Sequence, residues 1–318
     1  MKIVITCHLP NDIIQPLEER YDVVMWEKSS EPMPRERLLK EIEDADGLFT
    51  NVADQINEEL LERAKKLKVI STMAVGYDNI DVAAAKRKNI VVGHTPGVLT
   101  EATADLTFAL LMATGRRIVE GMDVIRQNQW KSWAPFFLTG QEIYAKTIGI
   151  IGMGRIGLGV AKRAKGFSMD ILYHNRSRNQ EAEQELQATY CDLDELLTKS
   201  DYVVLLAPST ENTYKMIGKE QFAKMKNTAV FINTSRGTNV DEEALYHALK
   251  EEEIFAAGLD VFDSEPISST HPLLSLRNVT VLPHIGSAAI ETREEMARLA
   301  CQNLLNGLEG RPLVHEVK

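Results

Sequence analysis

The feature that most constrains the fold is a glycine-rich segment near the middle of the chain, residues 146–157, which reads Lys-Thr-Ile-Gly-Ile-Ile-Gly-Met-Gly-Arg-Ile-Gly. An apolar, β-prone run leads directly into Gly152, Gly154 and Gly157, and a helix-compatible segment follows. In such a strand-turn-helix, the glycines allow a tight turn and close approach of a ligand to the backbone. The helix N-terminus offers free N–H groups to phosphate. The segment therefore predicts a dinucleotide-binding turn.

The chain on both sides of this segment alternates short apolar runs with charged, amphipathic segments. Before it, we expect strands at residues 2–6, 23–26, 47–50, 69–72 and 90–92, and helices at 12–20, 35–45, 57–64 and 82–87. After it, we expect strands at 170–174, 202–207, 229–233, 255–259 and 279–282, and helices at 192–199, 219–225 and 241–252. This alternation predicts two parallel sheets covered by helices. The apolar run before the glycines and the five later strands together make the second a six-stranded doubly wound sheet.

Three segments lie outside the alternation. A long apolar helix is expected at residues 100–117, with Thr100 as its N-cap, and suits a connector between two lobes. A final amphipathic helix is expected at 291–305. Residues 127–137 are aromatic without periodicity. They could be a loop packed on its own core, but we favour an arm that packs on another subunit, because exposed aromatic residues mark interfaces. The short linkers indicate a cleft between the lobes.

Composition excludes several classes of function. The chain has 318 residues, room for two domains, and a net charge of −10, so that no general attraction to nucleic acid or to an anionic membrane is expected. Its three cysteines are far apart and lack metal-ligand spacing, which favours reduced thiols in a cytoplasmic protein and no metal site. The N-terminal apolar run is too short for a signal peptide, and no stretch is long enough to span a bilayer.

The second strand after the glycines indicates which dinucleotide is bound. In NAD-binding turns an acidic residue at this position holds the ribose 2′-hydroxyl, but here the strand ends in Asn175-Arg176-Ser177-Arg178. Arg176 and the hydroxyl of Ser177 suit a 2′-phosphate, which an acid would repel, and Arg155 adds charge within the glycine loop. A solvated basic loop is the alternative. We predict that NADPH is preferred and that NADH can be used.

Later strands end in a set of polar residues. Ala207-Pro208, the segment with Arg236, the segment with Glu265 and the segment with His284 each follow an expected strand. Since ligands bind at the carboxyl ends of parallel strands, the arginine, glutamate and histidine are expected at one rim. Each alone could be structural, but together beside a nicotinamide they form an acid–base set.

The motifs that carry these residues also resemble a known family. Gly-Met-Gly-Arg-Ile-Gly, Asn-Thr-Ser-Arg-Gly, Ala-Gly-Leu-Asp-Val-Phe with Glu-Pro, and Leu-Pro-His-Ile-Gly-Ser-Ala resemble the D-isomer-specific 2-hydroxyacid dehydrogenases, as do residues 75–81 and 95–105. The resemblance spans nearly the whole chain in order. Val-Leu-Thr-Glu-Ala-Thr-Ala-Asp, a Trp-x-x-Trp arm and Asn-Arg-Ser-Arg are similar to the glyoxylate/hydroxypyruvate reductases and their 2-ketogluconate-reducing relatives. Asn175 departs from the NAD-using members, which carry an acid there.

The resemblance implies roles for the acid–base set. Arg236 would bind the substrate carboxylate and polarise the keto oxygen, and His284 would donate a proton as hydride reaches the keto carbon. Glu265 would hold the other imidazole nitrogen and favour its protonated form. Asp260 would accept from the nicotinamide carboxamide.

The resemblance also implies the remaining contacts. Backbone N–H groups of Val75 and Gly76 would hold the carboxylate from the other lobe, and Trp133 matches a tryptophan that reaches the active site of a partner subunit in a homodimer. The motifs and the resemblance together place the cofactor contacts at Thr103, Gly152, Gly154, Arg155, Ile156, Gly157, Asn175, Arg176, Ser177, Ala207, Pro208, Thr213, Thr234, Ser235, Arg236, Asp260, His284 and Gly286.

The implied architecture is a Rossmann dinucleotide-binding domain, residues 99–286, with a dimerisation arm at about 118–145, and a discontinuous flavodoxin-like substrate domain, residues 1–98 plus 287–318. The implied activity is NADPH-dependent reduction of glyoxylate or hydroxypyruvate to the D-2-hydroxy acid. A 2-ketogluconate reductase is an alternative within enzymes. A dinucleotide-sensing scaffold like the carboxy-terminal-binding-protein corepressors is an alternative of another class.

Overall fold

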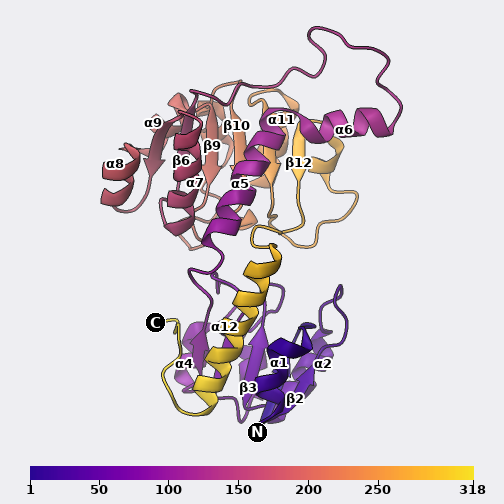
Figure 1. Ribbon diagram of the computed structural model, residues 1–318, viewed down its shortest axis with the longest axis vertical. Coiled ribbons are helices and arrows are strands. Elements are labelled where there is room, and N and C mark those ends of the chain that lie inside the picture. Colours follow the sequence, from indigo (N-terminus) through magenta and orange to yellow (C-terminus); the bar gives the residue numbers. More distant parts are fainter. The chain divides into compact units, whose positions relative to one another are not determined.

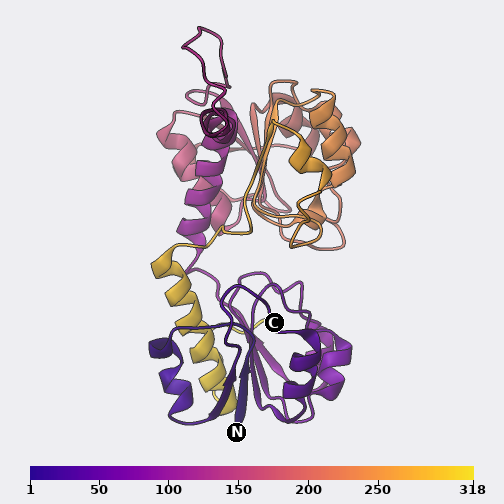
Figure 2. The same cartoon turned by 90° about the vertical axis from the view of Figure 1, so that its right-hand side faces the viewer.

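The computed structural model describes residues 1–318, which divide into two compact units. Met1–Leu99 and Ala288–Lys318 form the first unit, and Thr100–Ser287 form the second. Each unit contains one parallel sheet with helices on both faces (Figures 1 and 2). The predicted fold class, two parallel-sheet α/β domains, is confirmed. None of the helices is long and apolar enough to cross a membrane.

The first unit is built on a five-stranded sheet in the order β2-β1-β3-β4-β5. Its strands are β1 (Lys2–Ile5), β2 (Asp22–Met25), β3 (Gly47–Thr50), β4 (Val69–Thr72) and β5 (Val91–Gly93). Its helices are α1 (Asn11–Glu18), α2 (Arg35–Glu41), the 3₁₀ helix η1 (Ile42–Asp44), α3 (Glu58–Arg63), α4 (Val82–Arg87) and α12 (Ile290–Leu308). Helix α12 joins this sheet from the far end of the sequence, which makes the unit discontinuous.

Alternation along the strands sorts the core of this unit into two layers, because successive side chains of a strand face opposite sides of the sheet. Ile3 and Ile5 pack with α1 and α12, whereas Val4 packs with α2, α3 and α4. The apolar stripe of each helix therefore covers one face of the sheet.

The second unit is built on a seven-stranded sheet in the order β12-β11-β10-β9-β6-β7-β8. Its strands are β6 (Thr147–Ile151), β7 (Asp170–His174), β8 (Thr189–Tyr190), β9 (Tyr202–Leu205), β10 (Val230–Asn233), β11 (Ala256–Leu259) and β12 (Val279–Val281). Its helices are α5 (Thr100–Gly115), α6 (Ile118–Arg126), α7 (Arg155–Gly166), α8 (Gln180–Leu186), α9 (Leu193–Lys199), α10 (Lys219–Lys224), α11 (Glu242–Lys250) and the 3₁₀ helices η2 (Gly237–Asn239) and η3 (Pro272–Ser275). The direction of the strand order reverses between β6 and β9, the position where doubly wound sheets bind ligands.

The helices of this unit form two layers. Helices α5, α7 and α8 pack on one face of the sheet, and α9, α10 and α11 pack on the other. The predicted number of strands, six, is one too low. The strand that was missed is the edge strand β8, which has only two residues and shows no alternation. Helices α6 and α8 were also not predicted. Helix α6 buries none of its residues, so that no apolar stripe faces the core of its own unit.

Candidate active site

The glycine-rich turn connects β6 to α7, and its three glycines are required for different reasons. Gly152 has φ +103°, and a Cβ there would lie 2.7 Å from the backbone nitrogen of Ala207. A Cβ on Gly157 would clash with the carbonyl of Gly152. Gly154 has an ordinary extended backbone, and a Cβ there would meet no atom of the protein within 4 Å. Internal packing therefore explains Gly152 and Gly157 but leaves Gly154 to be explained by something outside the chain.

The start of α7 fits a phosphate group at that open position. Gly154 is the N-cap of this helix and supplies no side-chain hydrogen bond, so that the first-turn N–H groups are not capped by the protein. Arg155 is exposed and Ile156 is half-buried in the same turn. Uncapped N–H groups beside an open glycine form the cradle that a dinucleotide pyrophosphate requires. The residues present fit a nicotinamide dinucleotide.

The basic loop after β7 is tied to the glycine turn. Asn179 caps α8, and its Nδ2 donates to the carbonyl of Met153 at 2.9 Å. Arg178 is committed to Glu183 through two hydrogen bonds, whereas Arg176 is exposed and makes no ion pair. The sequence analysis assigned a 2′-phosphate to Arg176 and Ser177, and both side chains are exposed.

The end of β10 holds the segment with Arg236. The side-chain oxygen of Asn233 accepts from the N–H and hydroxyl of Ser235 at 3.0 Å, and its Nδ2 donates to the carbonyl of Arg236 at 2.9 Å. Asn233 is buried, so this turn is fixed from within the sheet. The hydroxyl of Thr234 lies 2.7 Å from that of Thr107 on α5.

His284 and Glu265 form a hydrogen-bonded pair. Nδ1 of His284 lies 2.6 Å from Oε2 of Glu265. No other polar group of the chain contacts the imidazole, which leaves Nε2 available to a ligand. The backbone of His284 is in the left-handed region at φ 55°, a conformation that costs free energy in a residue other than glycine and is common at functional sites.

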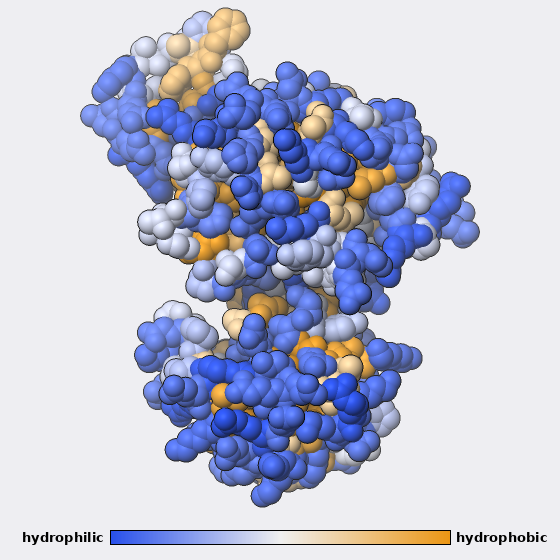
Figure 3. All heavy atoms as spheres, turned by 180° about the vertical axis from the view of Figure 1, so that it is seen from behind, coloured by the Kyte–Doolittle hydropathy of each residue, from blue (hydrophilic) through white to orange (hydrophobic).

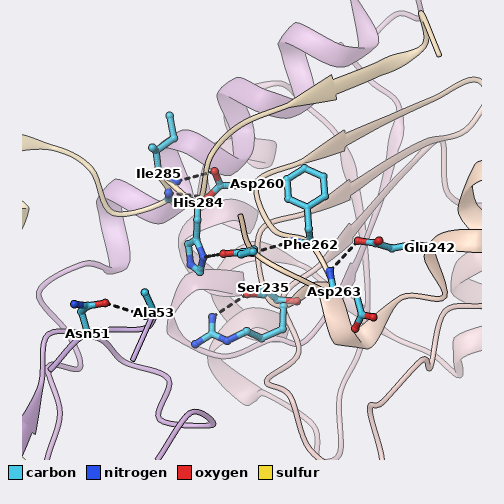
Figure 4. Close-up of polar contacts among 12 residues, drawn as sticks. Asn51, Ala53, Ser235, Glu242, Asp260, Phe262, Asp263, His284 and Ile285 are labelled. Carbon is cyan, nitrogen blue, oxygen red and sulfur yellow. Dashed lines mark hydrogen bonds and ion pairs between the residues drawn. The ribbon is translucent and has the colours of Figure 1, made fainter. Parts of the chain in front are cut away.

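Asp260 holds this backbone in place. Its carboxylate accepts from the N–H groups of Ile285 and Gly286, both at 2.7 Å, and its carbonyl accepts from the N–H of His284 at 2.9 Å. Asp260 is 1% exposed, and burial raises the pKa of its carboxyl, an effect that the two N–H donors partly oppose. Figure 4 shows these residues beside Phe262. Both carboxylate oxygens are thus already engaged by the backbone.

The electrostatics of the pair favour a charged Glu265. Burial opposes its ionisation and is the largest single effect, but the hydrogen bond and the charge of His284, together with two further contributions, outweigh it. The N–H of Phe262, which donates to Oε1 at 2.9 Å, and the positive charge of Arg236 act in the same direction. The pKa of the Glu265 carboxyl therefore lies below its usual value. Since Glu265 is ionised, Nδ1 of His284 carries a proton and donates it to this contact.

Gly237 brings the arginine segment against the glutamate segment. A Cβ on Gly237 would overlap the backbone of Phe262 and Asp263. Only glycine permits this approach, so that Arg236 and Glu265 belong to two loops in direct contact. The sequence placed the arginine, the glutamate and the histidine at one rim, and the structure brings all three together.

Other predicted cofactor residues lie around the same strand ends. Thr103 on α5 faces Gly286, where a Cβ would lie 3.4 Å from the threonine methyl. The hydroxyl of Thr213 donates to the carbonyl of Pro208 at 2.7 Å and so shapes the loop that follows β9. Ala207 is buried against the turn at Gly152.

Val75 and Gly76 lie in the first unit, after β4. Their N–H groups make no hydrogen bond within the chain. The carbonyl of Val75 lies 3.0 Å from Nδ1 of His94. Two adjacent unused N–H groups are a suitable place for an anion, and their contact with a substrate carboxylate stays a prediction.

Trp133 lies in the arm of the second unit, residues 118–145, which leads from α5 to β6 (Figure 1). Its side chain is 78% exposed, and Phe136 is 87% exposed. Trp133 therefore does not belong to the core of its own unit.

Reasoning from the sequence missed several supporting residues. The loop that carries Arg236 is held by Asn233, Asn239 and Gly237. An asparagine at a strand end, shortly before Ser-Arg-Gly, is a signal that could have identified Asn233. Glu242 contacts the glutamate loop from 21 residues away in sequence, which no local pattern reveals. No group of three or more His, Cys, Asp or Glu side chains is arranged to hold a metal ion.

Comparison with known proteins gives one consistent result. The family profile of the D-isomer specific 2-hydroxyacid dehydrogenase, NAD binding domain, matches residues 108–286. A glyoxylate reductase of Pyrococcus furiosus is 48% identical over 308 residues, which cover 96% of this chain and 91% of that protein. A solved structure from Thermus thermophilus is 45% identical, with a TM-score of 0.93 and 100% of both chains covered.

A further solved structure carries ligands. It is an NADPH-dependent glyoxylate/hydroxypyruvate reductase of Sinorhizobium meliloti in complex with NADP and malonate, 30% identical, with a TM-score of 0.86 over 99% of this chain and 96% of that one. These relatives cover nearly the whole chain, and the profile matches the unit that contains the glycine turn and the His284–Glu265 pair. The chain therefore belongs to the D-isomer-specific 2-hydroxyacid dehydrogenase family, in its glyoxylate reductase branch, and is a nicotinamide-dinucleotide-dependent oxidoreductase acting on CH–OH groups.

Proposed function

We propose that the protein reduces a small 2-keto acid, glyoxylate or hydroxypyruvate, to the D-2-hydroxy acid, with NADPH as the preferred cofactor. The observation that carries this proposal is the His284–Glu265 pair. Nδ1 of His284 lies 2.6 Å from Oε2 of Glu265, and the loop of Glu265 packs against the loop of Arg236. The glyoxylate reductases among the relatives support the choice of substrate.

The chain's own residues supply binding, orientation and a proton. Bound nicotinamide supplies the hydride. Arg236 binds the carboxylate of the keto acid and polarises its keto oxygen. His284 donates the proton from Nε2 to that oxygen, while Glu265 holds Nδ1 and stabilises the imidazolium before transfer. The imidazole is neutral afterwards and regains a proton from water, so that each turnover consumes one keto acid, one reduced cofactor and one proton.

The direct test is oxidation of NADPH and of NADH, followed by absorbance, with glyoxylate, hydroxypyruvate and 2-ketogluconate. We expect turnover with the two small acids and weaker turnover with the bulkier one. A preference for 2-ketogluconate would replace the substrate assignment. Absence of turnover with every keto acid, with cofactor binding intact, would instead favour a dinucleotide-sensing scaffold.

The preference for NADPH rests on the basic loop after β7. An acid is absent there, Arg176 is exposed without an ion pair, and Ser177 lies beside it. A guanidinium binds a phosphate through charge-assisted hydrogen bonds and gains little from a ribose hydroxyl. NADPH should therefore bind more tightly than NADH.

Arg176→Ala tests this assignment against Arg178→Ala, its neighbour that is paired with Glu183. We expect the Kd for NADPH to rise about 10- to 100-fold in Arg176→Ala, with the Kd for NADH nearly unchanged, because charge-assisted hydrogen bonds are worth about 1.5–3 kcal/mol. Arg178→Ala should change the ratio of the two Kd values much less. Equal losses for both cofactors in Arg176→Ala would refute the role of Arg176.

The arm is proposed to pack on a second copy of the chain. Helix α6 has no buried residue, and the arm beyond it exposes Trp130, Trp133, Phe136 and Phe137. Figure 3 shows apolar atoms gathered on this projecting segment. Exposed aromatic clusters of this kind mark protein interfaces.

Analytical ultracentrifugation measures directly whether two copies of the chain associate. The wild-type protein should sediment at twice the 35.6 kDa of one chain, and Phe136→Asp should shift it toward the monomer. Trp133→Ala should change the apparent affinity for the keto acid. A wild-type protein that stays monomeric at micromolar concentration would exclude the homodimer.

A further inference from the structure

A second histidine–glutamate contact lies next to the His284–Glu265 pair. Glu242 is the first residue of α11, and its Oε1 accepts from the N–H of Asp263 at 2.8 Å (Figure 4). Its Oε2 lies 3.3 Å from Nε2 of His271, just before η3. Neither residue has a part in the chemistry derived above, yet both side chains are about four-fifths covered.

His271 is oriented by its surroundings. Its Nδ1 is buried without a hydrogen-bond partner, and its ring lies edge-on to that of Phe262, with centroids 6.2 Å apart. A buried N–H without an acceptor is rarer and more costly than a buried acceptor without a donor. The proton of the neutral ring therefore belongs on Nε2, where it faces the carboxylate of Glu242.

The segment these residues hold is the turn that carries Glu265. In this turn, two successive N–H groups are each bound by a carboxylate: that of Phe262 by Glu265 and that of Asp263 by Glu242. Gly237 packs against the same backbone from the opposite loop. The position of Glu265 relative to His284 thus depends on a turn whose next N–H is fixed by Glu242.

We propose that Glu242 and His271 are positioning residues that hold the 262–265 turn, and with it the carboxylate of Glu265, at hydrogen-bond distance from His284. The importance for turnover rests on the proposed function, but the positioning itself does not. Loss of the Glu242 acceptor frees the N–H of Asp263, the turn relaxes, and Glu265 no longer meets Nδ1 at 2.6 Å. Because a general acid must be oriented as well as protonated, the rate of proton donation falls.

The experiment compares Glu242→Leu, Glu242→Gln and His271→Phe with Glu243→Leu, a matched control on the same helix turn whose side chain is exposed and makes no hydrogen bond. The first measurement is the proton NMR signal of the Nδ1–H of His284, assigned with His284→Gln, which reports the hydrogen bond to Glu265 and needs no substrate. The charged groups that face this imidazole are Glu265, Asp260 and Arg236, none of which is changed.

In Glu242→Leu we expect this signal to move upfield, toward its position in Glu265→Gln, because the hydrogen bond to Glu265 weakens. We also expect kcat for keto acid reduction to fall at least about tenfold, the low end of what outer residues that orient a reactive group are worth. Binding of NADPH should be unchanged. Glu242→Gln keeps an acceptor for Asp263 and should retain most of the activity. His271→Phe keeps the ring packing and should give an intermediate loss.

A wild-type Nδ1–H signal and wild-type kcat in a folded Glu242→Leu protein would overturn the proposal, as would a loss of the same size in Glu243→Leu. If Glu242→Leu does not fold, His271→Phe decides: an unchanged signal together with wild-type kcat would overturn the proposal. An inactive wild-type protein whose His284 signal still responds to Glu242→Leu would refute the proposed function and leave the positioning intact.

Discussion

The two sheets differ in what the polar side chains at their carboxyl ends do. After β1 and β3, the buried carboxylate of Asp54 accepts from the hydroxyls of Thr6 and Thr50 and from the N–H of Asn51. After β6, β7 and β12, the polar groups are left unused: the uncapped start of α7 at Gly154, the unpaired Arg176, and Nε2 of His284. The polar groups around Asp54 hold the first unit together, whereas those after β6, β7 and β12 are available to a ligand.

This difference shows that a polar residue at a strand end does not by itself identify a binding site. The useful signal is hydrogen-bonding capacity that the chain leaves unsatisfied, or a glycine that packing does not require. Asp54 and His284 occupy similar places in parallel sheets. The carboxylate of Asp54 is bound by groups of the chain, whereas Nε2 of His284 is bound by none. Substitution of Asp54 should therefore affect folding, whereas substitutions at the carboxyl ends of β6, β7 and β12 should affect ligands.

The largest effect is expected at His284. His284→Ala should lower kcat for keto acid reduction about 10³-fold, because general acids contribute about 10²–10⁴-fold. NADPH titration, followed by nicotinamide fluorescence, should give an affinity close to that of the wild type. The control is His247→Ala, an exposed histidine on α11 that should leave both values unchanged. Normal turnover in His284→Ala would remove the proposed proton donor.

Asp54→Ala probes the other edge. It leaves the buried hydroxyls of Thr6 and Thr50 without their acceptor and should lower the stability of the first unit by about 2–4 kcal/mol. Hydrogen exchange of the β1 and β3 amides measures this locally. Asp54→Asn, which keeps an acceptor, should lose less, and NADPH affinity should be unchanged in both variants. Wild-type exchange in Asp54→Ala would show that the cluster does not stabilise the edge.

The glycine turn allows the same separation within one loop. Gly154→Ala adds a methyl group that meets no protein atom, so that stability should be unchanged while NADPH affinity falls at least about tenfold, or about 1.4 kcal/mol. Gly157→Ala places its methyl against the carbonyl of Gly152 and should cost about 1–3 kcal/mol of stability. Thermal unfolding without cofactor and NADPH titration measure the two quantities. Full NADPH affinity in Gly154→Ala would mean that the phosphates lie elsewhere.

Much of the fold follows from local patterns. The apolar runs of β3, β4 and β7 and the helix α4 have the bounds that alternation and amphipathicity predict. Strand β8 has two residues and forms only because β7 is beside it, which no window of sequence shows. Helix α6 has apolar residues at helical spacing, Ile118, Met122 and Ile125, all of them exposed, so that its periodicity could have identified it.

The site was predictable to the extent that strand ends share one edge of a sheet. That rule brought Arg236, Glu265 and His284 to one rim, but it gave neither the left-handed backbone of His284 nor the engagement of both Asp260 oxygens by N–H groups. Such contacts depend on how loops from different strands fold against each other. A glutamate such as Glu242 is ordinary in the first turn of a helix. Its hydrogen bond from the N–H of Asp263 is visible only in three dimensions.

The pH dependence of a single turnover, in the wild type and in Glu265→Gln, tests most directly the claim that His284, supported by Glu265, donates the proton. The pKa of Glu265 lies below its usual value, so this carboxylate stays charged above about pH 5 and the profile reports the imidazole. Reduction should slow as pH rises and protonated imidazole is lost. Glu265→Gln removes the carboxylate that holds Nδ1, and its rate should fall at least about tenfold at low pH, where the wild type is fastest. Superimposable profiles for the two proteins would contradict the account.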